Sequence, residues 1–263
     1  VALWSPNTGV ADPAAVTQMA ARVFERQGGR ILFQSKVDQV DGPTVVLADG
    51  RRITCRHIVN AAGLYADSIA HGCGVGLDYA ILPFKGLYIY GDQTAPPLGR
   101  HVYPVPDPRN PFLGVHLTVT LQGRVKIGPT AIPALSRMNY TKFGGIRRDE
   151  LFDMVSTLPK FLMSPHHDGL GLIRSEVPKY LRRILVRQAA SLVPTASVSS
   201  FREWGKSGIR AQLFNLKERR LEMDFVVKEA PFQTHVLNAV SPAWTSSLSF
   251  GEYVAESVTR SLS

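Results

Sequence analysis

The chain changes character twice along its length, and this alternation restricts its fold more than any single motif does. A buried strand at 57–60 passes through a turn of tiny residues into a helix, which is an α/β element. Residues 81–129 show strands punctuated by Pro and Gly, typical of antiparallel sheet, and α/β character returns near the C-terminus. We therefore expect an α/β fold (α+β overall), with residues 1–78 and 199–263 in one domain and residues 79–198 in an inserted second domain.

Turn signals and short apolar runs predict the strands. Asp41-Gly42-Pro43 and Asp49-Gly50 divide the first segments into a small meander. The predicted strands cover residues 30–34, 37–40, 44–47, 52–55, 57–60, 83–90, 101–105, 112–120, 124–128, 208–213, 222–227 and 235–238.

Capping residues and apolar spacing predict the helices. Asp12-Pro13 supplies an N-cap and a proline at the first helical position, and Gly28-Gly29 ends that helix. Further helices are expected over residues 149–162, over residues 171–192 with an interruption at Pro178, and from Ser241-Pro242 onward. One face of the first helix carries Val16, Met19, Ala20, Val23 and Phe24, and the expected buried stripe of the last comprises Trp244, Leu248, Gly251, Ala255, Val258 and Leu262.

The composition is that of an ordinary globular chain, with 44% hydrophobic and 19% charged residues. No apolar run approaches the ~18 residues of a membrane helix, and the start at Val1 shows no signal-peptide pattern and is interpreted as the start of a fragment. Cys55 and Cys73 stand in no paired spacing, so we expect neither a disulfide framework nor a zinc site, and a reducing compartment.

The net charge of +9 suits an anionic small molecule, nucleic acid or an anionic membrane surface. The densest basic group has helical spacing, and we interpret it as a solvated helix face rather than a nucleic-acid or membrane patch. It comprises Lys179, Arg182, Arg183 and Arg187.

His116 is the first candidate for chemistry. Strand alternation turns it away from the apolar face of its segment and places it beside Gly114 and Thr118, where a ligand could approach. It is interpreted either as a hydrogen-bonded sheet histidine or as a general base.

Two turns and one strand offer further candidates. Ala61, Ala62 and Gly63 let a cofactor lie close to the backbone, although ordinary strand-to-helix turns use the same residues. Ser241-Pro242 predicts a helix N-terminus that either binds an anion or is simply capped. Arg210 indicates a carboxylate clamp or an internal salt bridge, with Lys85 and Tyr103 as weaker candidates. Composition and spacing alone lead only to an α/β protein with an anion pocket and no metal site.

Residues 103–118, YPVPDPRNPFLGVHLT, form the longest motif of the chain. Shorter motifs lie at 5–9, 60–67, 83–86, 208–212 and 238–247. Together they resemble the FAD-dependent L-2-hydroxyglutarate dehydrogenase/oxidase family of D-amino-acid-oxidase-like flavoproteins. Members of that family begin with a glycine-rich ADP-binding βαβ unit, which would precede Val1 and is missing here. Asn7 stands where the family usually has His, and Trp244 replaces a small residue.

The resemblance implies an FAD domain assembled from separated segments, with a mostly antiparallel substrate domain inserted in it. It places near FAD the residues Val37, Ala61, Ala62, Gly63, Lys85, Gly86, Ser241, Pro242 and Ala243. It further implies that His116 takes the 2-hydroxyl proton of a 2-hydroxy acid while hydride passes to the flavin. Arg210, helped by Tyr103 or Lys85, would hold a substrate carboxylate.

The identity of the electron acceptor stays open among oxygen, a quinone and a flavoprotein. Family members occur in mitochondria and bacteria, so the expected location is the cytoplasm, the inner-membrane periphery or the mitochondrion, with peripheral membrane association compatible and no nucleic-acid partner expected. Two alternatives remain: a related oxidase acting on an amine, an amino acid or glycerol 3-phosphate, and a non-catalytic fragment that binds anionic partners.

Overall fold

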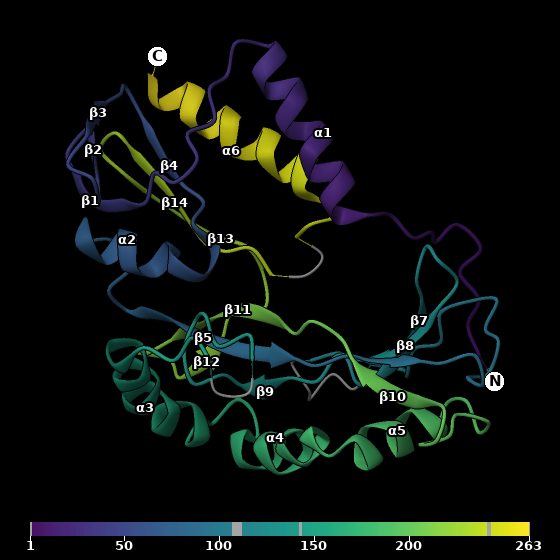
Figure 1. The fold of residues 1–263 in the computed structure, drawn as a ribbon. Helices are drawn as coiled ribbons and strands as arrows, with labels where there is room; N and C mark the ends of the chain where they lie inside the picture. The colour runs from purple at the N-terminus through teal and green to yellow at the C-terminus, as the bar shows by residue number, and fades with distance from the viewer. Residues whose placement is uncertain (1, 107–111, 142–143, 241–242, 263) are drawn as a thin grey trace.

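The computed structural model describes residues 2–106, 112–141, 144–240 and 243–262. Figure 1 shows the strands of the α/β part above and the antiparallel strands of the middle of the chain below, with the helices of residues 148–190 along the outer side of the lower layer. No helix in the described ranges is long and apolar enough to cross a bilayer.

The α/β part combines both ends of the chain. Strands β4 (Ile58–Asn60) and β14 (Gln233–Asn238) pair in parallel, and β13 (Val226–Ala230) completes the sheet in the order β13-β14-β4. The helical and meander elements of this part are α1 (Pro13–Arg26), β1 (Val37–Asp41), β2 (Thr44–Leu47), β3 (Arg52–Thr54), the 3-10 turn η1 (Gly63–Tyr65), α2 (Ala66–Gly72) and α6 (Ser247–Leu262).

The middle of the chain forms two four-stranded antiparallel sheets. Their orders are β12-β11-β5-β9 and β10-β6-β8-β7. The strands are β5 (Tyr79–Gly86), β6 (Ile89–Gly91), β7 (His116–Val119), β8 (Val125–Gly128), β9 (Ile132–Pro133), β10 (Phe201–Trp204), β11 (Gly208–Asn215) and β12 (Arg220–Leu221). Strands β10 and β11, from the predicted third segment, thus pair with strands of the middle segment.

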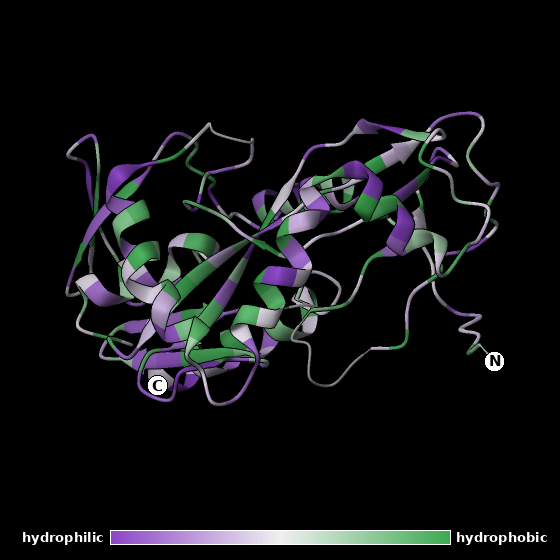
Figure 2. Ribbon diagram, turned by 90° about the horizontal axis from the view of Figure 1, so that it is seen from below, coloured by the Kyte–Doolittle hydropathy of each residue, from purple (hydrophilic) through white to green (hydrophobic). Residues whose placement is uncertain are grey.

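Helices cover the outer side of these sheets, and apolar side chains fill the space between. The helices are α3 (Arg148–Leu162), α4 (Gly169–Glu176), the 3-10 turn η2 (Val177–Tyr180) and α5 (Arg182–Ala190). Phe84 and Phe214 of the sheet pack with Phe161 of α3 in one core, and Leu117 and Ile127 pack with residues of α5 in another. Figure 2 shows helices striped with hydrophobic and hydrophilic residues, as expected when one side of each helix covers a core.

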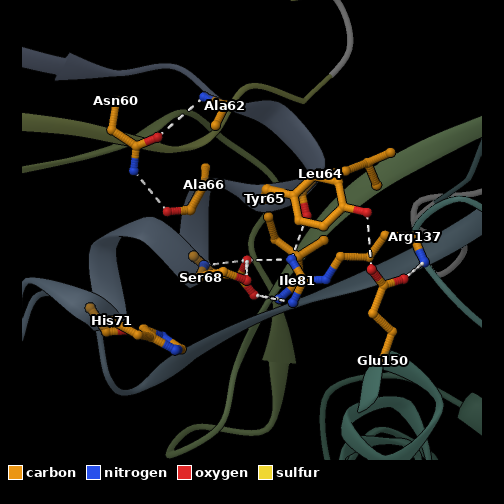
Figure 3. Close-up of polar contacts among 12 residues, drawn as sticks. Asn60, Ala62, Leu64, Tyr65, Ala66, Ser68, His71, Ile81, Arg137 and Glu150 are labelled. Carbon is orange, nitrogen blue, oxygen red and sulfur yellow. Dashed lines mark hydrogen bonds and ion pairs between the residues drawn. The ribbon is translucent and has the colours of Figure 1, made fainter. Parts of the chain in front are cut away.

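A buried ion pair joins the α/β part to the inserted sheets. Arg137 donates to both carboxylate oxygens of Asp67 on α2, and Asp67 also accepts from the backbone N–H of Ile81. Nearby, Tyr65 donates to Glu150, which also accepts from the backbone of Arg137 (Figure 3). Burial alone would raise the pKa of Asp67, but the hydrogen bond and charge of Arg137, together with the backbone hydrogen bonds of Ile81 and Ser68, outweigh burial, and the pKa is lowered.

Several predicted strands are wrong in extent. Residues 30–34 form no strand, because Gln34 adopts a positive φ of 52° that ends extended backbone. Within the predicted strand 101–105, only Val102 forms a β-bridge, an isolated antiparallel one to Leu117. The predicted strand 112–120 is reduced to β7, and the predicted strand 222–227 is replaced by β12 and β13.

The predicted buried stripe of the last helix is also wrong. The last helix begins at Ser247 rather than at Ser241, and its buried residues are Val254 and Ser257. Ser241 and Pro242 lie outside the described residues. The first helix forms as predicted, with Asp12 accepting from two backbone N–H groups, but none of its residues is buried.

Candidate functional site

One face of the sheet β10-β6-β8-β7 gathers the candidate catalytic groups. His116 begins β7 opposite Gly128, and two residues along the strand Thr118 lies opposite Lys126. Since opposite residues and alternate residues share one side of an antiparallel sheet, these four positions lie on the same face. At Gly128 a Cβ atom would lie 2.5 Å from the Leu87 carbonyl oxygen, so glycine is needed where Tyr88 approaches β8.

His116 has the properties of a neutral base. Its Nδ1 lies 2.9 Å from the Gly114 carbonyl oxygen, so the proton belongs on Nδ1 and the Nε2 lone pair is left to accept another. The ring is 8% exposed and stacks on Tyr103 at 4.2 Å between centroids. Burial, with smaller contributions from the charges of Lys126 and His101, lowers the pKa of His116 against the raising effect of the Gly114 hydrogen bond. The imidazole is therefore neutral near pH 7.

The space expected beside Gly114 is partly filled. A Cβ atom at Gly114 would lie 3.2 Å from Pro104 Cγ, so a ligand approaches His116 from elsewhere. A hollow of about 470 Å³ lies next to Tyr103, and its lining includes Thr8, Gly9, Thr118 and Lys126. Residues of the short motif at 5–9 therefore line the same hollow as Tyr103 of the motif at 103–118.

Arg210 lies in the other antiparallel sheet, β12-β11-β5-β9, and is within electrostatic range of Tyr88. It lies on β11 opposite Phe84, with its guanidinium carbon 5.3 Å from the centre of the Phe112 ring. Burial lowers the pKa of Arg210, and the charge of Tyr88 opposes this. Burial raises the pKa of Tyr88; Tyr103 acts in the same direction, whereas Arg210 lowers it. Of these groups, Tyr103 is in direct contact with His116 through their stacked rings.

Arg210 and Lys126 have no carboxylate partner within the described part of the chain. A half-buried cation without a counterion is costly, because it loses water without gaining a partner. Cations of this kind are suited to bind an anionic ligand. In the same described ranges, no group of three His, Cys, Asp or Glu side chains gathers to hold a metal.

Lys85 lies on the other side of its sheet. It pairs with Ile209, one position from the Phe84–Arg210 pair, so strand alternation points Lys85 and Arg210 to opposite faces. Its Nζ donates to Asn139 Oδ1 at 2.6 Å and to the Thr141 carbonyl at 2.7 Å. Burial lowers the pKa of Lys85. The residue lines a separate cavity of about 460 Å³ together with Leu87, Tyr140, Tyr180 and Trp204.

The tiny residues after β4 border a third cavity, of about 490 Å³ and mostly apolar lining. Its lining includes Ala61, Gly63, Ala211, Ala239, Ala243 and Gly251. Gly63 has a φ of +56°, and a Cβ atom there would meet nothing within 4 Å, so the backbone is open to a flat group. Asn60 fixes this turn by accepting from Ala62 N–H and donating to the Ala66 carbonyl (Figure 3).

These residues fit the ring system of a flavin, which needs a flat, apolar slot beside open backbone. Ala61, Gly63 and Ala243 line that slot. Val37, in β1, and Ala62 are not among its lining residues. Gly86 packs inside the inserted sheets, where a Cβ atom would lie 3.1 Å from Pro129 Cβ. Ser241 and Pro242, which are also predicted to lie near FAD, are outside the described residues.

Sequence reasoning missed Tyr88 and Lys126. The signal for Lys126 was the turn at Gly123, since a tight hairpin there sets Lys126 opposite Thr118 and hence on the side of His116. Tyr88 lies between β5 and β6, and only the packing of the two sheets places it beside Arg210.

Comparison with known proteins identifies the family of the chain. The DAO family model, described as FAD-dependent oxidoreductase, matches residues 1–257. L-2-hydroxyglutarate dehydrogenase of Salmonella houtenae is 32% identical over 267 residues, which cover 97% of this chain and 61% of that protein. The mitochondrial enzyme of the same name from Homo sapiens is 30% identical, over 98% of this chain and 59% of that protein. The chain thus spans about 61% of the length of the bacterial relative.

Solved structures share the fold. FAD-bound L-α-glycerophosphate oxidase from Mycoplasma pneumoniae superposes with a TM-score of 0.60 at 17% identity, covering 88% of this chain and 51% of that one. Glycine oxidase from Bacillus cereus gives a TM-score of 0.54 at 16% identity, covering 94% and 56%. The expected fold class is confirmed, and so are the family resemblance and its cofactor, FAD. On the match of residues 1–257, the chain belongs to the DAO family of FAD-dependent oxidoreductases.

Proposed function

We propose that the protein oxidises a 2-hydroxy acid to the 2-oxo acid, with L-2-hydroxyglutarate as the foremost substrate. The observation that carries the proposal is the neutral, buried imidazole of His116, which shares a sheet face with Lys126, a cation without a carboxylate partner in the described ranges. The L-2-hydroxyglutarate dehydrogenases that match nearly the whole chain support the choice of substrate.

In this proposal each residue has one task. His116 Nε2 accepts the proton of the 2-hydroxyl group, while its Nδ1–H stays bound to the Gly114 carbonyl. Arg210 binds the 1-carboxylate and orients C2, and Tyr103 holds the imidazole plane by stacking. FAD, when bound, supplies the acceptor for the C2 hydride. Ala61, Gly63 and Ala243 leave space for the flavin ring.

The acceptor that reoxidises the flavin and the location of the protein are open parts of the proposal. Oxygen, a quinone and a flavoprotein are the candidate acceptors, the last two being compatible with work at a membrane surface. The two free cysteines suit a reducing compartment, cytoplasmic or mitochondrial.

The test is a substrate panel on the complete protein purified with bound FAD. We expect L-2-hydroxyglutarate to bleach the oxidised flavin absorption anaerobically, whereas its D-enantiomer, glycine and glycerol 3-phosphate do not. Bleaching by glycine or glycerol 3-phosphate in place of L-2-hydroxyglutarate would assign the protein to a related oxidase. A protein that binds FAD but responds to none of these acids would contradict the proposed function.

A further inference from the structure

Lys126 lies on the catalytic face but has no role in the chemistry just described. It is the second residue of β8, opposite Thr118 on one side and Tyr90 on the other. The His116–Gly128 pair is the next pair on the same face. Its Nζ lies 4.5 Å from the centre of the Tyr88 ring. The charge of Arg210 also lowers the pKa of Tyr88, so both cations act on the same tyrosine.

Both cations lack a counterion in the described ranges, and burial lowers the pKa of Lys126 as it does that of Arg210. The contact with Tyr88 compensates only part of the lost hydration, because a cation–π contact is weaker than a charge-assisted hydrogen bond. Two buried cations elsewhere in the described ranges do have carboxylate partners: Lys179 binds Glu176, and Arg137 binds Asp67. Lys126 also borders the hollow of about 470 Å³ beside Tyr103, so an incoming anion has space to reach it.

From this arrangement we propose that Lys126 binds the distal carboxylate of the substrate and thereby selects 2-hydroxy dicarboxylic acids over 2-hydroxy monocarboxylic acids. The inference rests on the proposed function, since it assigns the 1-carboxylate to Arg210 and the oxidised carbon to His116. Two separate cations serve a dicarboxylate, whereas a monocarboxylic acid needs one. Lys126 is a specificity-determining residue in this scheme and takes no proton.

The experiment compares acids that differ at one end only. L-2-hydroxyglutarate and L-2-hydroxyvalerate have the same chain length, but the second has a methyl group in place of the distal carboxylate. In Lys126→Met we expect kcat/KM for L-2-hydroxyglutarate to fall roughly 10- to 100-fold, as for loss of a hydrogen bond between charged groups. The value for L-2-hydroxyvalerate should change less than about threefold. Lys126→Arg should recover part of the loss.

A binding measurement supplies a readout that does not depend on turnover. Titration calorimetry of the FAD-bound protein with glutarate and with pentanoate should show that Lys126→Met weakens glutarate alone. Lys228→Met is the matched control, because Lys228 also lies over a tyrosine ring, with its Nζ 5.4 Å from the centre of Tyr79. Lys228 is on β13, in the sheet β13-β14-β4 of the α/β part. The control should bind both acids as the wild type does. If Lys126→Met does not fold, the same measurements are made on Lys126→Gln, whose side chain ends in an uncharged polar group.

The outcomes separate the two claims. Equal loss for both acids, or no loss for either, would overturn the role of Lys126 and leave the 2-hydroxy-acid function intact. If the wild type neither binds nor oxidises any of the four acids, the proposed function fails and the role of Lys126 fails with it.

Discussion

At the scale of single residues, His116 combines a lone pair on Nε2 with a pKa lowered by burial. If it is the base, His116→Gln should lower kcat by roughly 10²- to 10⁴-fold, because the hydroxyl proton then has no acceptor. The flavin spectrum and the dissociation constant of glutarate should change little. His166→Gln, at an exposed position on the loop before α4, is the control. A kcat unchanged in His116→Gln would remove His116 from the reaction.

The pH profile tests the same residue independently. A base must be unprotonated, so kcat/KM should rise with pH through the pKa of His116 and stay level above it. Because that pKa is lowered, the midpoint should lie below the ordinary value of about 6.5. Lys126→Met removes a positive charge that disfavours the imidazolium, so the midpoint should move to higher pH. A midpoint in the variant that is unchanged or lower would show that Lys126 does not act on His116.

At the scale of elements, the buried pair of Asp67 and Arg137 fixes α2 against the loop that follows β9. In Asp67→Asn, Arg137 would keep a buried charge without a partner, which costs about 3–5 kcal/mol of unfolding free energy. Urea denaturation should therefore show a clear loss of stability. Asp49→Asn, which disrupts an exposed pair with Arg51, should leave stability unchanged within error. Equal effects of the two substitutions would show that the buried pair is not structural.

The same pair has a defined pH range. The pKa of Asp67 is lowered in the folded state, so its contribution to stability is present above the unfolded value of about 3.9 and is lost as the pH falls through the folded value.

The candidate site shows how far sequence alone reaches at this scale. The motif at 103–118 identified His116 and Tyr103, and Arg210 followed from its apolar strand. Strand register decides to which face of the sheet each of these side chains points. Lys85 and Arg210 are close in the two paired strands, yet one step of alternation points them to opposite faces. Tyr88 reaches the site because two sheets pack together, and no local pattern encodes that.

At the scale of the whole molecule, the chain exposes more surface than its mass predicts. Its accessible surface is 16239 Å², whereas a compact monomer of 28.9 kDa exposes about 11,400 Å². Helix α1 contributes to the excess, since Met19 is 53% exposed and Phe24 50% exposed. The amphipathic spacing predicted the helix correctly, but spacing cannot show which surface covers a stripe.

This distribution of contacts predicts where the molecule opens first. Residues 13–26 form a helix with no buried residue, and an isolated helix of that length is marginal in water even with a good N-cap such as Asp12. Strand β5, by contrast, pairs with β11 over all its eight residues and carries Phe84 into the core. Hydrogen–deuterium exchange followed by mass spectrometry should therefore label peptides from 13–26 within the earliest time points and peptides from 79–86 last. Asp12→Ala, which removes the cap, should speed exchange in the helix further and leave β5 unchanged. Protection of the helix equal to that of β5 would mean that its apolar face is covered in solution.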